Sequence, residues 1–415
     1  MRYNVLKHIL FLFIAANSII GQDAKDYEKN FINDLSEGYS NFKNNLEAGG
    51  VIAGFNYSGD FFSNVHGGIS KGSRFINQFQ LSADLKLHKF FNLNETIIHA
   101  SLLGVNGKMP NDLVGSTQGL SNIETENIFK IYDIWIDYYF NEDVSLLYGL
   151  FDVNSEFDTK YNSMLFINPS HGIGSEFGLT GENGPSIYPN TSLGFRLNYK
   201  FDHDNYIKLG AFDAVPGTAE DPYSPHFDFG FKDGVLFISE FGYDCYSDYE
   251  GDTGSNLCIN YAIGAWYSTR KGQDFINPNK KSTNFGFYSF LESRILDLGN
   301  DRMLSAFMRS GLANPDINQI DLYFSGGFVL SNLFAENDQL GIAFASSKNS
   351  RKFIKSQSIL NENPEDIETN IELSYLLTLS DHFSLQPDIQ YFINPAHNST
   401  LSSSICIGIR TSFNF

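Results

Sequence analysis

An alternation of apolar and polar residues with a period of two, repeated in segments of roughly ten residues, constrains the fold of this chain more than any other feature. The final segment shows it most clearly. One side of the extended chain would carry Ile405, Ile407, Ile409, Phe413 and Phe415, and the other Ser404, Gly408, Arg410, Ser412 and Asn414. Successive side chains of a β-strand point to opposite faces, so this strand would have one apolar and one polar face. Such strands are typical of a transmembrane barrel, whose two faces contact lipid and water.

Similar segments recur along the chain and predict an even-numbered barrel. Charges stay on one side of them: Arg196 and Lys200 oppose an apolar face of residues 193–201. A soluble sandwich would alternate too, but its charges would lie on outward faces. The predicted fold class is therefore all-β, a transmembrane antiparallel up-and-down β-barrel of about 16 strands. The strands are expected near residues 46–58, 74–88, 95–105, 127–140, 143–151, 191–201, 205–213, 234–244, 257–268, 283–291, 302–310, 319–330, 338–347, 367–379, 382–392 and 402–415.

The composition agrees with a barrel and excludes other classes. Aromatic residues make up 15% of the chain and Gly reaches 36, which suits many strands joined by turns. Past residue 21, every apolar run is broken before the roughly 20 residues that a helical span requires. The net charge of −20 argues against a nucleic-acid partner, because phosphate binding needs clustered Lys and Arg.

Three parts are expected along the chain. Residues 1–21 have the basic start, apolar centre and small-residue exit of a signal peptide. Residues 22–45 would form an N-terminal periplasmic segment, either a short helix or a linker, and residues 46–415 the outer-membrane barrel. Cys245 and Cys258 could pair in an oxidising compartment and leave Cys406 free, or all three could be thiols.

The connections between the predicted strands alternate in length, as they do in a barrel with both termini in the periplasm. Residues 141–143, 202–204 and 380–381 form tight turns, whereas 106–126, 152–190, 214–233 and 348–366 are long. The longest, 152–190, is rich in turn residues, and such loops are usually functional. We expect it to fold inward and narrow the lumen.

Several short stretches resemble the carbohydrate-selective porin family, also called the porin B type. They are GLFDVNSEFD at 149–158, LFINPSHGIG at 165–174, GPSIYP at 184–189, DGVLFISEFGY at 233–243, GAWY at 264–267 and LQPDIQYFINP at 385–395, followed by Gly408-Ile-Arg410 and the final Phe415. The resemblance covers most of the mature chain. It implies a sixteen-stranded barrel of the outer membrane of a Gram-negative bacterium, which lets sugars diffuse inward past a constriction of loop and wall residues. The turn between Cys245 and Cys258 and the acidity of the chain depart from the family pattern and leave the preference for neutral sugars less secure.

Candidate solute-binding residues follow from strand parity and from the resemblance. Parity turns polar side chains of four segments toward the lumen: Arg74, Gln78, Gln80, Asp84, Asp133, Asp137, Arg196, Gln386, Asp388 and Gln390. Within the long loop, Asn154, Glu156 and Asp158 match the family's signature. Acids there and arginines on the wall would set a transverse field at the constriction. Trp135 and Trp266 would stack on sugars if they face the lumen, or anchor the barrel at the membrane interface.

Other readings remain open at this stage. Residues 154–158 could simply fix the loop through hydrogen bonds. The chain could be a general or cation-preferring porin, because Asp84, Asp133, Asp137 and Asp388 share lumen parity. It could also be a plugged barrel that binds at the surface or acts as an enzyme.

Catalysis is not expected, because no nucleophile elbow is present and Glu156 and Asp158 are only two residues apart. No cofactor or metal is expected either. The expected partners are small sugars, outer-membrane lipid and lipopolysaccharide, and the barrel-assembly machinery, which would recognise the C-terminal strand ending at Phe415.

Overall fold

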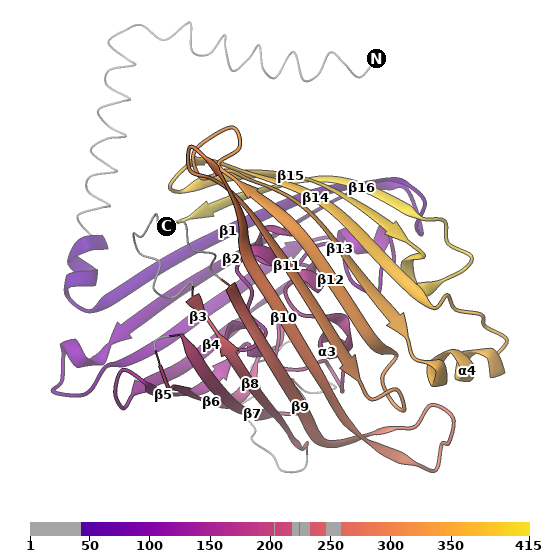
Figure 1. Ribbon diagram of the computed structural model, residues 1–415, viewed down its shortest axis with the longest axis horizontal. Helices are drawn as coiled ribbons and strands as arrows, with labels where there is room; N and C mark the ends of the chain where they lie inside the picture. Colours follow the sequence, from indigo (N-terminus) through magenta and orange to yellow (C-terminus); the bar gives the residue numbers. More distant parts are fainter. Residues whose placement is uncertain (1–42, 203, 218–223, 225–232, 246–258) are drawn as a thin grey trace, which may run out of the picture. The chain divides into compact units, whose positions relative to one another are not determined.

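Sixteen antiparallel strands form one closed barrel in the computed structural model, which describes residues 43–202, 204–217, 224, 233–245 and 259–415 (Figure 1). The predicted fold class and strand number are confirmed. The first eight strands are β1 Val51–His66, β2 Gly72–Lys86, β3 Thr96–Gly107, β4 Ile128–Tyr139, β5 Val144–Phe151, β6 Ser192–Lys200, β7 Asn205–Asp213 and β8 Val235–Tyr243. The others are β9 Ile259–Gln273, β10 Lys281–Gly299, β11 Arg302–Ala313, β12 Ile320–Ser331, β13 Gln339–Asn349, β14 Ile367–Ser380, β15 Phe383–Ile393 and β16 Ser404–Asn414.

Each strand pairs with its neighbours in sequence, and β16 closes the barrel against β1. Closure removes the open edges that would leave backbone N–H and C=O groups unpaired in hydrocarbon. At the seam, Asp60 of β1 lies opposite Arg410 of β16, and the guanidinium donates to the carboxylate at 2.7 and 2.8 Å. The first and last strands are thus held by ladder hydrogen bonds and by an ion pair on the inner face.

The alternation along the strands separates lipid from lumen as predicted. On β16, Ile407, Ile409 and Phe413 are exposed on the outer face, and Arg410 lies on the inner face. One position departs from strict alternation. Tyr132 is buried inside the barrel and donates to Asp152, because an irregularity of the β3–β4 register shifts the parity of β4 there and turns Ile131 outward.

The four connections expected to be long follow the odd-numbered strands β3, β5, β7 and β13, and the three expected tight turns follow the even-numbered strands β4, β6 and β14. The predicted inward folding of 152–190 is confirmed, since many of its side chains are buried against the wall. The sequence-based expectation missed that residues 108–127 also fold inward. The first strand also differs: it runs from Val51 to His66 rather than over 46–58.

Helices are few and short in the described part of the chain, and none of them is long and apolar enough to cross a membrane. Residues 43–48 are helical. The other helical segments are η1 Leu87–Lys89, η2 Pro110–Leu113, η3 Val153–Ser155, η4 Asn162–Leu165, η5 Pro169–His171, α3 Ser175–Gly178, α4 Arg351–Ile359 and η7 Pro395–His397. The predicted signal peptide, most of the predicted periplasmic segment and Cys258 lie outside the described residues. The Cys245–Cys258 pairing therefore stays a prediction, while Cys406 is a free, buried thiol.

Candidate functional site

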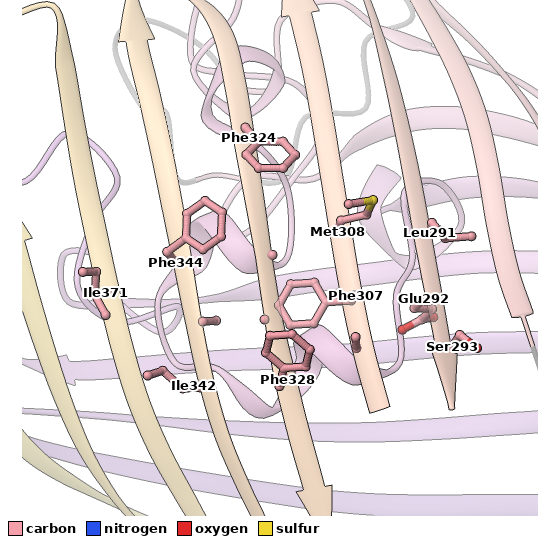
Figure 2. Close-up of a pocket in the computed structure, with 14 residues that line it drawn as sticks. Leu291, Glu292, Ser293, Phe307, Met308, Phe324, Phe328, Ile342, Phe344 and Ile371 are labelled. Atoms are coloured by element: carbon pink, nitrogen blue, oxygen red, sulfur yellow. The ribbon is translucent and has the colours of Figure 1, made fainter. Parts of the chain in front are cut away.

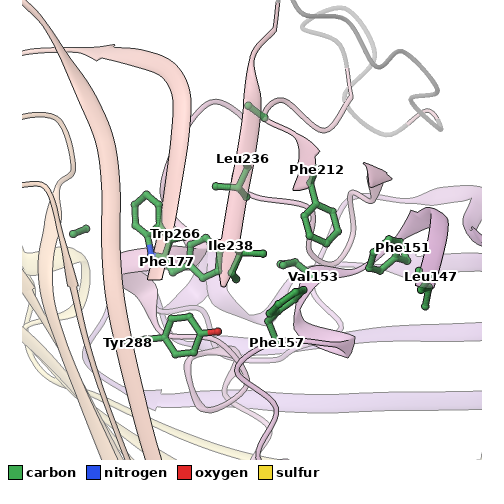
Figure 3. Close-up of a cluster of buried hydrophobic side chains, with 12 residues drawn as sticks. Leu147, Phe151, Val153, Phe157, Phe177, Phe212, Leu236, Ile238, Trp266 and Tyr288 are labelled. Atoms are coloured by element: carbon green, nitrogen blue, oxygen red, sulfur yellow. The ribbon is translucent and has the colours of Figure 1, made fainter. Parts of the chain in front are cut away.

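The long connection 152–191 is held inside the barrel by an apolar cluster (Figure 3). Val153, Phe157 and Phe177 of the connection pack against inward-facing residues of β7 to β10. The ring of Phe177 stacks on Trp266 of β9 with centroids 5.1 Å apart. Because burying an aromatic side chain removes a large apolar area from water, this cluster stabilises the inward position of the connection.

Carboxylates of the barrel wall accept hydrogen bonds from the backbone of the same connection. Glu292 of β10 accepts from the backbone N–H groups of residues 161 and 162 at 2.9 and 2.8 Å. Glu372 of β14 accepts from those of residues 167 and 168 at 2.5 and 3.0 Å. Glu240 of β8 accepts from that of residue 158 at 2.7 Å. A loop buried in a barrel needs partners for its backbone, and these carboxylates supply them in place of water.

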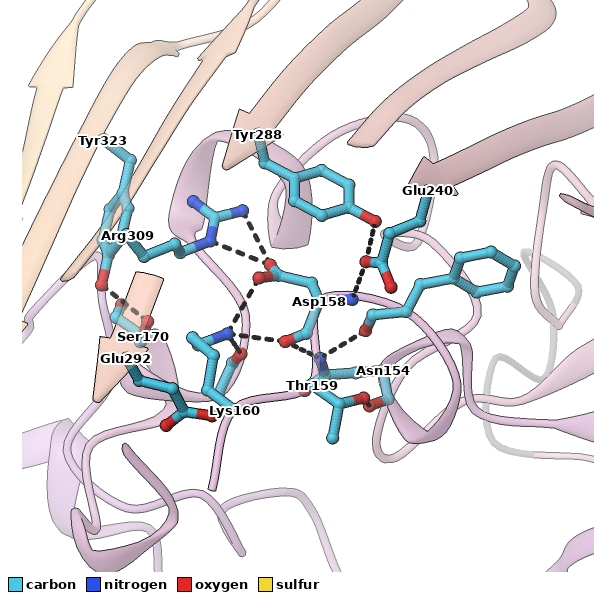
Figure 4. A network of polar contacts seen from close by, with 12 residues as sticks. Asn154, Asp158, Thr159, Lys160, Ser170, Glu240, Tyr288, Glu292, Arg309 and Tyr323 are labelled. Carbon is cyan, nitrogen blue, oxygen red and sulfur yellow. Dashed lines mark hydrogen bonds and ion pairs between the residues drawn. The ribbon is translucent and has the colours of Figure 1, made fainter. Parts of the chain in front are cut away.

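A buried ionic network joins the centre of the connection to the wall (Figure 4). Arg309 of β11 contacts Asp158 at 2.9 Å and Glu176 at 2.8 Å, and all three side chains are fully buried. Lys160 contacts Asp158 at 2.9 Å from the other side. The guanidinium lies over the rings of Tyr288 and Tyr323, 5.7 and 5.1 Å from their centroids.

Two glycines leave room for this network. A Cβ atom at Gly311 would lie 1.8 Å from Oε1 of Glu176, and one at Gly174 would lie 1.9 Å from Nη1 of Arg309. The ion pair between Arg309 and Glu176 thus occupies space that any other residue at these two positions would fill.

The second inward connection, 108–127, is attached in the same manner. Glu368 of β14 accepts from Ser116 Oγ and from the backbone N–H groups of residues 117 and 118. Ser121 Oγ donates to Asp60 at 2.6 Å, which links this connection to the seam of the barrel. Gln390 of β15 donates to the carbonyl of Leu120 at 2.9 Å. The lumen is therefore narrowed by two connections.

An open, polar cavity of about 500 Å³ remains inside the wall formed by β3 to β9. It extends from the connection 152–191 to the short turns 140–143 and 201–204. Its lining combines charged groups with flat aromatic faces. The lining includes Trp135, Asp137, Glu156, Arg196, Asn198 and Lys208.

Arg196 of β6 lies in the wall of this cavity between two carboxylates. Its Nε donates to Glu156 at 2.7 Å, and its Nη2 donates to Asp137 of β4 at 3.1 Å. Lys208 of β7 donates to the backbone carbonyl of Glu156 at 2.7 Å. Glu156 is the partner that remains partly accessible, with 19% of its side chain exposed. These contacts hold Glu156 at the cavity surface, where a solute can reach it, while Arg196 lies beside it with 5% of its side chain exposed.

Trp135 faces the cavity and is held by a neighbouring ring. It stacks on His99 of β3 with centroids 4.7 Å apart, and His99 Nδ1 lies 2.5 Å from Asp84. Trp135 lines the cavity, whereas Trp266 is buried in the apolar cluster under the connection. Neither Trp faces lipid, so the alternative of interface anchors is wrong for both.

The predicted lumen residues all lie on inner-facing positions, but only some reach the cavity. Trp135, Asp137, Glu156 and Arg196 line it. Asp84 lies behind His99, and Asp133 binds Ser101 at 3.4 Å. Gln386, Asp388 and Gln390 are buried, and Gln386 and Gln390 donate to carbonyls of the inward connections. Arg74, Gln78 and Gln80 are half-buried on β2 and do not line this cavity.

Asn154, Glu156 and Asp158, the three signature residues of the loop, have different surroundings. Asn154 donates to the carbonyls of Phe157 and Asp158 at 3.1 and 3.3 Å, and Asp158 is sealed in the buried network. Both contacts match the alternative reading, in which these residues fix the loop. Glu156 is the member of the signature that faces the cavity.

Several residues that hold the inward connections were missed from the sequence: Lys160, Glu176, Glu240, Glu292, Arg309 and Glu368. Four of these six lie on strands at inward parity, so alternation could have identified them. Their partners could not be found that way, since the contacts join residues 82 to 252 positions apart.

Comparisons with known proteins agree with this architecture. Residues 70–415 match the family described as carbohydrate-selective porin, OprB family. The chain is 21% identical to Porin B of Pseudomonas aeruginosa, with 85% of each chain covered. It is similar to the high-pH structure of Pseudomonas putida OprB, with a TM-score of 0.80, 20% identity and coverage of 91% of this chain and 97% of that one. The outer-membrane channel DcaP of Acinetobacter baumannii gives a TM-score of 0.54 at 9% identity, covering 88% and 98%.

Proposed function

The chain belongs to the carbohydrate-selective porin, OprB family, and on that premise we propose that small sugars cross the outer membrane through its lumen by passive diffusion and bind in the cavity beside Arg196. The cavity is the observation that carries the proposal. Its volume of about 500 Å³ falls in the range of small-molecule sites, roughly 300–1,000 Å³. Its lining has the two kinds of group that a pyranose needs: polar side chains for hydroxyls and an indole face for the apolar side of the ring.

In this proposal Arg196 and Glu156 form the selective contact. Arg196 holds the Glu156 carboxylate at 2.7 Å, and a sugar hydroxyl would donate to this partly exposed carboxylate. Because both groups already have protein partners, a sugar gains little net energy by replacing water there. Weak binding is what a diffusion pore requires, since a solute that binds tightly does not leave.

Planar-bilayer recording of the purified full chain tests the proposal. Glucose or a short oligosaccharide added to one side should reduce the ionic current in a saturable manner. Trp135→Leu should weaken this block by roughly tenfold, as expected for loss of a stacking contact of about 1–1.5 kcal/mol. Ile136→Leu on the same strand is the matched control, because Ile136 has outward parity and should leave the block unchanged. A chain that opens no channel, or a current that sugars leave unchanged, would refute sugar passage.

A cation-preferring pore is the second candidate, and the charge of the cavity favours it. Six acidic side chains line the cavity, namely Asp137, Glu142, Asp143, Glu156, Asp204 and Asp244, against three basic ones, Arg196, Lys200 and Lys208. A reversal potential measured in a salt gradient decides between the two. Strong cation selectivity combined with no sugar block would favour the second candidate.

The remaining partners are proposals of the same kind. The C-terminal strand would be the segment that the barrel-assembly machinery recognises. In support, Phe415 and Phe55 exchange backbone hydrogen bonds of 2.9 and 3.0 Å, and their rings lie 6.3 Å apart, so the aromatic end is part of the barrel. Outer-membrane lipid and lipopolysaccharide would surround the apolar outer face. No catalytic step is proposed: Asp158 is sealed by Arg309 and Lys160, so Glu156 and Asp158 do not share one substrate site.

A further inference from the structure

A groove interrupts the apolar outer face of β10 to β14 (Figure 2). Its floor is Gly326 of β12, which lies in register between Met308 of β11 and Phe344 of β13. Figure 2 shows Phe324 and Phe328 on the same strand, toward opposite ends of the groove. The groove has a volume of about 650 Å³ and an almost wholly apolar lining. An apolar groove of this volume on a lipid-facing wall fits a flexible hydrocarbon chain.

Outward-facing hydroxyls of the same strands, which lie nearer the long connections than the groove does, bond to one another. Ser346 and Thr369 share a hydrogen bond of 2.8 Å between their hydroxyls, and Ser289 and Ser310 share one of 3.0 Å. Paired hydroxyls present little unsatisfied polarity to hydrocarbon.

Cations stand at the outer end of the same groove. Lys348 has the outward parity of Phe344 on β13 and lies four residues nearer the long connections, about 13 Å at the usual strand rise. In register it lies beside Leu322 of β12 and Ile367 of β14. The long connections of bacterial barrels face the cell exterior, so this is the level of the outer-leaflet headgroups.

Helix α4, which follows β13 directly, adds two more cations in a fixed arrangement. Residues 348–355 hold four of the chain's 28 basic residues and no acid, in a chain with a net charge of −20. Lys352 anchors the helix through Asp316 at 2.7 Å and Asp274 at 3.1 Å, and Phe353 packs on Phe275. Arg351 and Lys355 are exposed and lie on one side of the helix, since they are four residues apart.

The acids around these cations leave a positive excess. Asp321 of β12 interacts with Lys348 and Arg351. Asp274 and Asp316 are engaged by Lys352 and Lys280. The acids at 362, 365 and 366 follow in the segment that returns to β14. Lys348 and Arg351 thus share one acid, Asp321, and Lys355 adds a third positive charge on the side of Arg351, which suits a negatively charged phosphate.

We propose that the outer face of β10 to β14, together with α4, binds a phosphate-bearing glycolipid of the outer leaflet. One acyl chain would occupy the groove over Gly326, and the headgroup phosphate would contact Lys348, Arg351 and Lys355. The groove and the cation cluster are independent observations on the same part of the wall, about 13 Å apart along β13. This inference rests on the outer-membrane location of the protein and not on which solute passes through it.

Native mass spectrometry of the full chain, released from vesicles that contain diphosphoryl lipid A, tests the site without any sugar present. Lys348→Gln/Lys355→Gln should weaken lipid A retention by about thirtyfold, because interfacial lysines each contribute roughly a fivefold factor. The matched control is Lys71→Gln/Lys108→Gln, which removes two exposed lysines from other outer connections and should retain lipid A normally. Gly326→Leu fills the groove and should reduce retention while the bilayer conductance stays unchanged.

Further arms of the experiment separate the possible occupants. Lipid A without its phosphates should be retained as weakly by the wild-type protein as diphosphoryl lipid A is by the double variant. Equal retention of both lipids, or equal retention by the double variant and its control, would overturn the proposal. Self-association that Gly326→Leu abolishes while lipid retention is unaffected would also overturn it, because the groove would then receive a second copy of the chain.

Discussion

Two arginines of the inner wall have similar partners and different surroundings. Arg309 lies between Asp158 and Glu176, and all three side chains are fully buried. Arg196 lies between Asp137 and Glu156 at the surface of an open cavity, and Glu156 is partly accessible. The difference shows that an arginine between two acids inside a barrel is not by itself a solute site. An arginine that the loop covers holds the loop in place, whereas an arginine beside an open cavity can influence a solute.

The largest expected effect distinguishes the two sites by stability. Arg309→Met leaves Asp158 and Glu176 buried with one cation, Lys160, near only the first of them. Removing one partner of a buried ion pair typically costs about 3–5 kcal/mol. The free energy of unfolding in urea should fall by that order, and protease should cleave within residues 152–191. Arg302→Met changes an exposed arginine of the same strand and is the control. An unchanged free energy of unfolding in Arg309→Met would show that the buried network does not hold the connection.

At Arg196 a smaller effect is expected, and it should appear in the block of the current by sugar. Arg196→Gln keeps a hydrogen-bond donor but removes the charge beside Glu156. The sugar concentration for half-maximal current block should rise by roughly tenfold, as expected when a hydrogen bond to a charged group is lost. Stability should change less than in Arg309→Met, because water in the cavity can solvate the acids. If Arg196→Gln unfolds as readily as Arg309→Met, both arginines are structural.

The smallest effect concerns a partly exposed ionic cluster, the contacts of Lys352 with Asp316 and Asp274 on the outer connections. The hydrogen bond from Lys352 lowers the pKa of Asp316, and backbone N–H groups of Ile276 and Asn277 lower the pKa of Asp274. An aspartate with a lowered pKa stabilises the fold above its unfolded value, near 3.9, and loses that contribution as the pH falls through the folded value. These contacts should therefore hold α4 at neutral pH and release it only as the pH falls below about 4 and through the lowered pKa values of the folded protein.

A spin label measures this release locally. The label at Ser358→Cys on α4 should gain mobility below about pH 4, and the same label at Thr400→Cys, on another outer connection, should not. The buried Arg309 network should keep its resistance to protease through the same change of pH. Release of both regions together would mean that burial does not separate them.

Alternation was enough to predict the barrel because the apolar and polar residues of each strand indicate which of its faces is turned to lipid. Ile407 faces lipid and Arg410 faces inward, and each lies on the side that its position in the sequence indicates. The method failed where parity itself breaks, as at Tyr132, since a register irregularity is a local backbone feature without a marker in the pattern. It also placed β1 too early.

The candidate site was predictable only in part, for a different physical reason. Parity correctly turned Arg196 and Gln386 inward, but it could not distinguish a side chain that lines a cavity from one that a loop covers. Gln386 donates to the carbonyl of Leu165, 221 residues away, and only the path of the long connection determines that contact. A signature such as residues 154–158 identifies a loop, and the fold of that loop assigns the task of each member.

The seam between β1 and β16 has a consequence for biogenesis. Arg410 lies five residues before the end of the chain, yet it contacts Asp60 near the start of the barrel and Ser121 and Asn122 of the connection 108–127. None of these contacts can form until the last strand has been exported and has docked. Closure of the barrel and final packing of the connection 108–127 therefore occur together, and a chain truncated before residue 410 would lack both.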